Sequence, residues 1–296
     1  MGAPETAPLR LHEDAAPFLE AINATAAATG FPARLIEKDY FCTAFLQHLA
    51  PVDGILVFKG GTCLAKVHAG FYRLSEDLDF SIPAPVDATR GERSRLARGI
   101  KSLLGAIGRT LPGVHVSRAL AGANNSAQYI AVLEYRSVLR GVQDTIEFEV
   151  GLREPLLTPV VHGSAKTLLL DPASGRELIP AINVPCLSRE ETIAEKLRAA
   201  LCRREVAIRD FYDIDHFVQR LGIRLDDSTL IDLVRQKVAV PGNAAADVSP
   251  ARLDLLRAQV ETELMPVLRA KDFDAFDLDR AFATVAGVSV LLDKRR

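Results

Sequence analysis

The sequence predicts an α+β fold, in which a mixed sheet with helices packed on it extends from about residue 50 to 170 and an all-helical half follows. Between residues 114 and 152, three segments alternate apolar and polar side chains with the period of half-buried strands. From residue 188 onward, apolar residues recur with the period of helices. We therefore expect two domains, residues 1–180 and 181–296, with the connecting loops "PASGREL" and "NVPCLS" near the boundary.

The composition is that of a globular protein long enough to bury a core, with 296 residues of which 48% are hydrophobic and 25% charged. No apolar run reaches the roughly 18 residues that span a bilayer, and the N-terminus lacks the order of a signal peptide. We expect a cytoplasmic protein without a membrane partner. A net charge of -2 gives no global reason to bind nucleic acid, so such binding would need a local patch.

The first part of the chain predicts two amphipathic helices, at residues 13–28 and 34–50. A buried strand is expected at 54–58, followed by a Gly-Gly turn and a short helix from Thr62 to Gly70. After a polar loop, "LDFSI" (78–82) predicts a second strand.

Asp77 and Asp79 flank the start of this second strand, where side chains two residues apart point to the same face. Two carboxylates this close repel unless they are solvated, protonated or neutralised by a cation, and such oxygen ligands suit Mg²⁺. A solvated strand end is the alternative. Gly60 and Gly61 let backbone N–H groups approach an anion, although a structural tight turn would look the same. Together, the turn and the acids fit a site for a metal-bound triphosphate.

Residues 88–110 predict a basic helical segment before strands at 114–119, 128–135 and 145–152. The segment has a single acid, Glu92, and six basic residues: Arg90, Arg93, Arg95, Arg98, Lys101 and Arg109. This densest positive patch of the chain suits RNA phosphates, or is simply a solvated helix face.

The helical half is expected to begin with a capping box of Ser188 and Glu191. Its first helix has an apolar stripe, and Lys196 lies near the edge of that stripe. Taken alone, such a lysine is usually a solvated cation. The stripe consists of Ile193, Leu197, Ala200 and Leu201.

The four cysteines are scattered, without a Cys-x-x-Cys pair or a histidine at ligand spacing. We expect buried free thiols rather than a zinc site or disulfides.

Five linked motifs resemble the AbiEii/AbiGii-type nucleotidyltransferase toxin family, which includes the MenT-type toxins. The motifs cover about residues 34–217 in order. They are "LIEKDYF", "FKGGTCLAKV", "RLSEDLDFSI", "IEFEVGLREPLL" and "SREETIAEKLRAALCRREVAIRDFYDI". The loop between Gly61 and Asp77 is longer than in the simplest nucleotidyltransferases, a feature that this family shares.

The resemblance implies a polymerase-β-like core that uses magnesium and a nucleoside triphosphate (NTP) to attach a nucleotide to an acceptor, in MenT-type members the 3′ end of tRNA. It implies metal binding by Asp77 and Asp79 and assigns the triphosphate to the glycine turn. The triphosphate-binding residues would be Gly60, Gly61 and Thr62, with Ser75 near the turn and with Lys59, which is alternatively a surface lysine.

A third carboxylate is expected on a later strand, where Glu147 and Glu149 share a face. The family pattern favours Glu149. It also matches Lys196 to the family's essential lysine and makes Asp210 catalytic, with Asp213 in reserve. Alternatively, these acids form helix salt bridges with neighbouring arginines.

The leading hypothesis is therefore a magnesium-dependent nucleotidyltransferase toxin that modifies RNA, with an antitoxin as partner or regulator. Thr62 and Ser75 lie near the turn, but the mode of control stays open. The alternatives are transfer to a small molecule or protein hydroxyl, and a catalytically silent nucleotide- or RNA-binding module.

Overall fold

The computed structural model describes residues 9–49, 56–85 and 87–294. The chain divides into two compact units. Unit 1 comprises Met1–Pro155 and Val160–Cys186, and unit 2 comprises Leu156–Pro159 and Leu187–Arg296.

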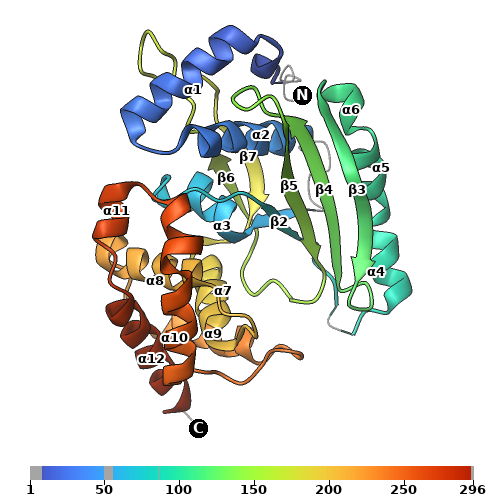
Figure 1. Cartoon of the computed structure of the whole chain (residues 1–296). Coiled ribbons are helices and arrows are strands. Elements are labelled where there is room, and N and C mark those ends of the chain that lie inside the picture. Colours follow the sequence, from blue (N-terminus) through green and yellow to red (C-terminus); the bar gives the residue numbers. More distant parts are fainter. Residues whose placement is uncertain (1–8, 50–55, 86, 295–296) are drawn as a thin grey trace. The chain divides into compact units, whose positions relative to one another are not determined.

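Unit 1 contains a seven-stranded mixed sheet in the order β3-β4-β5-β2-β1-β7-β6 (Figure 1). Strand β2 pairs parallel with β5 and antiparallel with β1, while β1 pairs parallel with β7. The outer strands add antiparallel pairs on both sides. The strands are β1 (Val57–Lys59), β2 (Leu78–Ser81), β3 (Val114–Ala123), β4 (Gln128–Arg136), β5 (Gln143–Gly151), β6 (Val161–Ala165) and β7 (Ile182–Cys186). The predicted mixed sheet is confirmed; residues 54 and 55 of the predicted first strand lie outside the described residues.

The loop prediction for "NVPCLS" is wrong, because residues 182–186 form strand β7. This strand pairs with β6 over its whole length and with β1 at Phe58 and Cys186. Proline has no backbone N–H to donate to a neighbouring strand and is typical of edge strands and loops. Because of Pro185, the sequence does not predict a strand here. As a result, unit 1 extends beyond the predicted boundary at residue 180.

The central strands have one apolar and one polar face, as the alternation of side chains requires. On the apolar face, the ring of Phe80 lies 5.3 Å from that of Phe58 and 5.1 Å from that of Phe148. All three are buried. Lys59 directly follows Phe58, and Asp79 directly precedes Phe80. Both therefore point to the other, polar face of the sheet.

Helices of unit 1 pack on this sheet. The ring of Phe41 on α2 stacks on Tyr135 of β4 at 3.9 Å, and α5 and α6 run along β3 (Figure 1). The helices are η1 (Leu11–Glu13), α1 (Ala15–Thr29), α2 (Ala33–Leu49), α3 (Gly60–Cys63), the π-helix η3 (Leu64–Ala69), α4 (Arg90–Leu96), α5 (Arg98–Gly105) and α6 (Ile107–Thr110). These helices confirm the N-terminal helix predictions, although the helix after the turn begins at Gly60 rather than Thr62.

Unit 2 is helical, as predicted. Helix α7 packs on α8 and α9, and α12 packs on α8. Arg280 of α12 donates two hydrogen bonds to the carboxylate of Asp215 on α8, at 2.8 and 2.7 Å. The helices are α7 (Arg189–Cys202), α8 (Ile208–Leu221), α9 (Ser228–Val238), α10 (Pro250–Gln259), the π-helix η4 (Val260–Leu264), η5 (Met265–Val267), α11 (Ala270–Asp274) and α12 (Leu278–Asp293).

Only half of the predicted capping box forms at α7. The Ser188 hydroxyl accepts the N–H of Glu191 at 3.1 Å. The Glu191 side chain instead accepts the backbone N–H groups of Leu157 and Thr158 and pairs with the buried Lys237 at 2.6 Å. The predicted apolar stripe of α7 is buried.

No helix in the described ranges is both long enough and apolar enough to cross a bilayer.

Candidate functional site

The glycine turn and the Asp-x-Asp segment lie against each other. Gly60 adopts φ +74°, and a Cβ atom built on it would lie 2.0 Å from Oδ2 of Asp79. The hydroxyl of Thr62 donates a hydrogen bond to the backbone carbonyl of Asp77. Only a glycine fits at position 60, because the turn needs a left-handed conformation and the Asp79 carboxylate fills the side-chain space.

Lys59, Asp79 and Glu149 form a row across three neighbouring strands. Asp79 of β2 is in register with Lys59 of β1 on one side and with Glu149 of β5 on the other. Register partners point to the same face, and all three side chains are half-buried. The Nζ atom of Lys59 lies near the end of β5, 3.9 Å from where a Cβ of Gly151 would be.

Asp79 and Glu149 therefore share one face of the sheet, and Asp77 lies in the loop directly before β2. Asp77, Asp79 and Glu149 are half-buried residues, and carboxylate oxygens suit Mg²⁺, which keeps water and phosphate oxygens among its ligands. In the described part of the chain, three or more possible metal-ligand atoms lie within 4.8 Å of one another only at two cysteines and a histidine. The oxygen atoms of the three carboxylates are therefore farther apart than this.

Glu147 does not join the row in the same way. Its side chain is exposed and pairs with Arg118 of β3 at 3.2 Å. The structure thus distinguishes the two glutamates that the sequence left open.

Arg73 is a residue of this site that sequence reasoning missed. Its guanidinium is buried, and its Nη2 atom lies 2.8 Å from where a Cβ of Gly61 would be. The Oγ atom of Ser75 lies 2.9 Å from the same point. Both side chains therefore reach the glycine turn from the loop, and a single arginine in a polar loop gives no pattern that would have revealed it.

Glu76, beside Asp77, connects this loop to helix α2. Its Oε2 atom accepts hydrogen bonds from Arg34 at 2.7 Å and from Lys38 at 2.9 Å. Burial alone would raise the pKa of Glu76, but the two cations outweigh it and hold the pKa below its ordinary value. These contacts fix the segment that leads into Asp77 and Asp79.

Lys196, Asp210 and Asp213 form a cluster of their own in unit 2. The Lys196 ammonium lies 2.8 Å from a carboxylate oxygen of each aspartate. Both aspartates are buried, and Asp210 also accepts a hydrogen bond from Arg203 at 3.2 Å. Lys196 is therefore not a solvated cation, and both predicted acids contact it.

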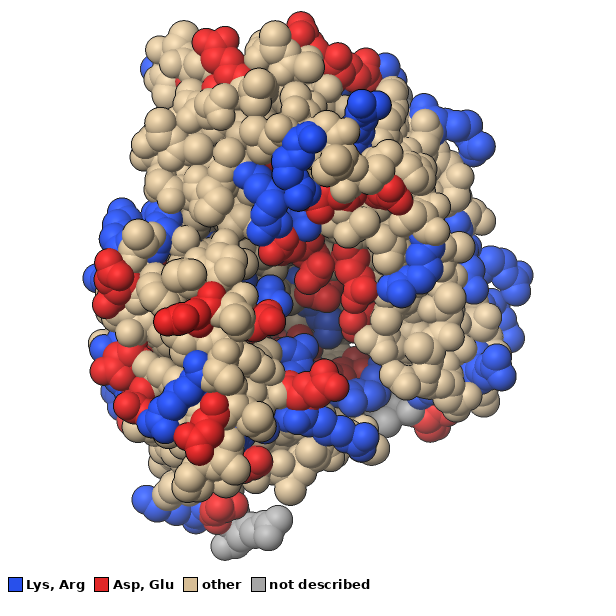
Figure 2. Space-filling model, viewed as in Figure 1, with Lys and Arg blue, Asp and Glu red and all other residues tan. Residues whose placement is uncertain are grey.

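The basic segment forms helices α4, α5 and α6, and its basic side chains are exposed except Arg93, which is half-buried. Lys and Arg side chains gather along the right-hand edge of Figure 2, where Figure 1 places α4 and α5. This surface belongs to unit 1.

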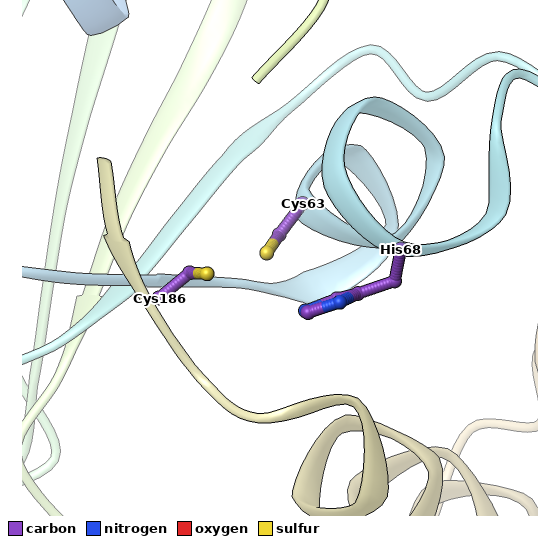
Figure 3. Close-up of side chains that lie close together, drawn as sticks. All are labelled: Cys63, His68 and Cys186. Atoms are coloured by element: carbon purple, nitrogen blue, oxygen red, sulfur yellow. The ribbon is translucent and has the colours of Figure 1, made fainter. Parts of the chain in front are cut away.

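All four cysteines are buried free thiols, as predicted. However, Cys63 of α3, His68 of η3 and Cys186 of β7 point toward one another (Figure 3). A hydrogen bond from Cys63 lowers the pKa of the Cys186 thiol, against the effect of burial, and His68 and the Gly163 N–H lower it further. The sequence does not predict this cluster, because Cys186 is distant in the chain from the other two residues and its strand has no strand-like pattern.

Comparisons with known proteins place the chain in a family. The sequence pattern of the family described as "Nucleotidyl transferase AbiEii toxin, Type IV TA system" matches residues 44–286. A search of curated protein sequences found no significant match.

Two solved structures have a similar fold. The nucleotidyltransferase toxin MenT4 from Mycobacterium tuberculosis has 19% sequence identity and a TM-score of 0.54, over 92% of this chain and 97% of MenT4. JHP933 from Helicobacter pylori has 18% identity and a TM-score of 0.51, over 90% of this chain and 94% of JHP933. The predicted α+β nucleotidyltransferase fold is thus confirmed, and the match over most of the chain shows that the protein belongs to the AbiEii nucleotidyltransferase toxin family.

Proposed function

We propose that the protein is a magnesium-dependent nucleotidyltransferase toxin that transfers a nucleotide from an NTP to the 3′ end of tRNA and so blocks translation. The contact between Gly60 and Asp79 is the observation that carries this proposal. A triphosphate needs backbone N–H donors and a cation at the same place, and this contact brings the glycine turn and the acidic face together.

The triphosphate is bound by residues of unit 1. The backbone N–H groups of Gly60 and Gly61 and the hydroxyl of Ser75 orient it, and Lys59 neutralises phosphate charge. The Thr62 hydroxyl holds the turn against Asp77 through its hydrogen bond to the backbone carbonyl. Arg73 adds positive charge behind Gly61.

Asp77, Asp79 and Glu149 are the residues that would hold Mg²⁺. When bound, the metal neutralises the phosphate oxygens and favours the departure of pyrophosphate. Glu149 also accepts the proton of the acceptor hydroxyl, whose oxygen attacks the α-phosphorus in line with the leaving pyrophosphate. Glu149 is half-buried, so part of its side chain stays accessible to solvent.

Lys196 and Asp210 of unit 2 are the further residues that the family motif assigns to the reaction. The family motif assigns Lys196 to the stabilisation of charge on the leaving pyrophosphate. The two aspartates that contact its ammonium restrict its position.

RNA is the proposed acceptor because of the exposed basic side chains of α4 to α6. Each cation that neutralises a phosphate adds to affinity and to its salt dependence. We expect the double variant Arg95→Glu, Arg98→Glu to modify RNA more weakly than the wild type, with a smaller dependence of its RNA affinity on salt. Its affinity for NTP, measured without RNA, should be unchanged. Unchanged RNA modification by this double variant would contradict the acceptor assignment.

The proposed function is tested by incubating the purified protein with Mg²⁺, total tRNA and each of the four NTPs in turn, followed by sequencing of the RNA 3′ ends. We expect added nucleotides at tRNA 3′ ends that depend on Mg²⁺. In parallel reactions, hydroxyl-bearing small molecules or a protein acceptor replace the tRNA. Labelling in those reactions alone would overturn RNA as the acceptor but keep the transferase activity. An antitoxin would be recognised as a protein that prevents the labelling.

A further inference from the structure

The cluster of Cys63, His68 and Cys186 has the geometry of a metal site. One sulfur atom from each cysteine and one ring nitrogen of His68 all lie within 4.8 Å of one another. A tetrahedral zinc ion, with bonds of 2.0 to 2.3 Å, holds its ligand atoms about 3.3 to 3.8 Å apart. The three ligand atoms thus need to move only about 1 Å to surround an ion.

The donor set selects the class of metal. Two thiolates and one imidazole are soft and borderline ligands, which suit Zn²⁺ and not the Mg²⁺ proposed for the carboxylates. The two cysteines are fully buried, so the sulfur atoms are shielded from bulk solvent. His68 is half-buried and gives the cluster a side that borders solvent, from which an ion enters.

Neighbouring residues leave space at the sulfur atoms. A Cβ atom on Gly163 of β6 would lie 2.8 Å from Sγ of Cys186 and 2.4 Å from Cγ1 of Val67. A glycine at this position therefore keeps the sulfur of Cys186 clear of a side chain from the neighbouring strand. Cys63 and His68 come from one continuous helical segment, α3 and η3, and Cys186 comes from the end of β7.

We propose that Cys63, His68 and Cys186 bind one Zn²⁺ ion, with water as the fourth ligand. Each thiol that becomes a ligand releases its proton to solvent. The ion connects β7 to the segment that begins with the glycine turn, since Cys63 directly follows Thr62. Its ligands are separate from the residues assigned to the transferase reaction, so the proposal does not rest on the proposed function.

The test measures metal binding rather than activity. Full-length protein is reduced, treated with a chelator and titrated with Zn²⁺ in competition with a chromophoric chelator, and separately with Co²⁺, whose thiolate complexes absorb light through sulfur-to-metal charge transfer. We expect one equivalent of metal per chain, a charge-transfer band with Co²⁺, and a rise in melting temperature with Zn²⁺.

Variants identify the ligands. His68→Ala should weaken Zn²⁺ binding by at least about 100-fold, because even the loss of a residue that only supports a ligand costs about 10- to 100-fold. Cys186→Ala should remove most of the charge-transfer band. Cys42→Ala is the matched control, a buried cysteine of unit 1 outside the cluster, and it should bind as the wild type does.

Two results would overturn the proposal. One is metal binding that is absent in the wild type or equal in Cys42→Ala and His68→Ala. The other is a Cys63–Cys186 disulfide in place of metal, recognised under non-reducing conditions by the loss of two hydrogen masses. If Cys186→Ala does not fold, His68→Ala still tests the proposal. His68 is half-buried, so its truncation removes little of the buried core.

Discussion

The carboxylate of Asp79 occupies the space that a side chain at Gly60 would need. A Cβ atom there would come within 2.0 Å of Oδ2 and 2.8 Å of Cβ of Asp79. Gly60→Ala must therefore displace Asp79, and it also strains the left-handed backbone by about 1–2 kcal/mol. We expect at least a 100-fold loss of nucleotide transfer to RNA, measured with labelled NTPs.

Gly70→Ala is the control for backbone strain. Gly70 also has a positive φ, +67°, but nothing lies within 4 Å of its Cβ position. This variant should lose similar stability from strain and keep its transfer activity. Equal activity of the Gly60 and Gly70 variants would show that the contact with Asp79 does not matter.

Glu149 and Glu147 provide a second matched pair. Glu149 is in register with Asp79, whereas Glu147 pairs with Arg118 at the surface. Glu149→Gln should lower the rate of transfer by about 100-fold or more, as expected for the loss of a proton acceptor and metal ligand. Glu147→Gln should stay within about twofold of the wild type, because exposed ion pairs contribute little. The reverse order of these two rates would move the third carboxylate to Glu147.

Lys196 is predicted to stabilise unit 2 as well as to assist the reaction. Lys196→Met leaves Asp210 and Asp213 buried without their shared cation, which costs about 3–5 kcal/mol. Arg203→Met removes a cation whose side chain is 53% exposed and should cost under about 1 kcal/mol. Urea unfolding of both variants measures the difference. If Lys196→Met is as stable as the wild type, the lysine is not part of a structural ion pair.

Glu76 should make stability depend on pH. Its folded-state pKa is depressed, so the ionised carboxylate stabilises the fold above its ordinary pKa of 4.5, and this contribution is lost as the pH falls through the lowered value. The difference in unfolding free energy between the wild type and Glu76→Gln should be largest near pH 7 and shrink below about pH 4.5. Glu20→Gln, at an exposed position of α1, is the control for the loss of a surface carboxylate. A difference that grows on acidification would contradict the role of Arg34 and Lys38.

Much of the fold follows from local sequence patterns. Alternation predicts β4 and β5 because their buried faces have period two, and helical periodicity predicts α7 because its apolar stripe packs against α8 and α9. Strand β7 has no comparable pattern, since it is five residues long and contains Pro185. Its formation depends on pairing with β1 and β6, which the sequence does not reveal locally.

The candidate site shows the same division. The spacing of Asp77 and Asp79 and the Gly-Gly turn are local and were predicted. The position of Arg73 at the turn and the pairing of Glu76 arise from contacts between segments distant in the chain. The cluster at Cys63 includes a residue of β7, a strand that the sequence does not predict. Long-range contacts of this kind have no spacing signature.

The most direct test of the account is the transfer of label from α-labelled NTPs to tRNA by Asp79→Asn, compared with the wild type and with Asp87→Asn, an exposed aspartate that lies outside the proposed site. If the acidic face and the glycine turn form the nucleotide site, Asp79→Asn should transfer at least about 100-fold less label while Asp87→Asn transfers as much as the wild type. Equal transfer by a folded Asp79→Asn variant would contradict the account.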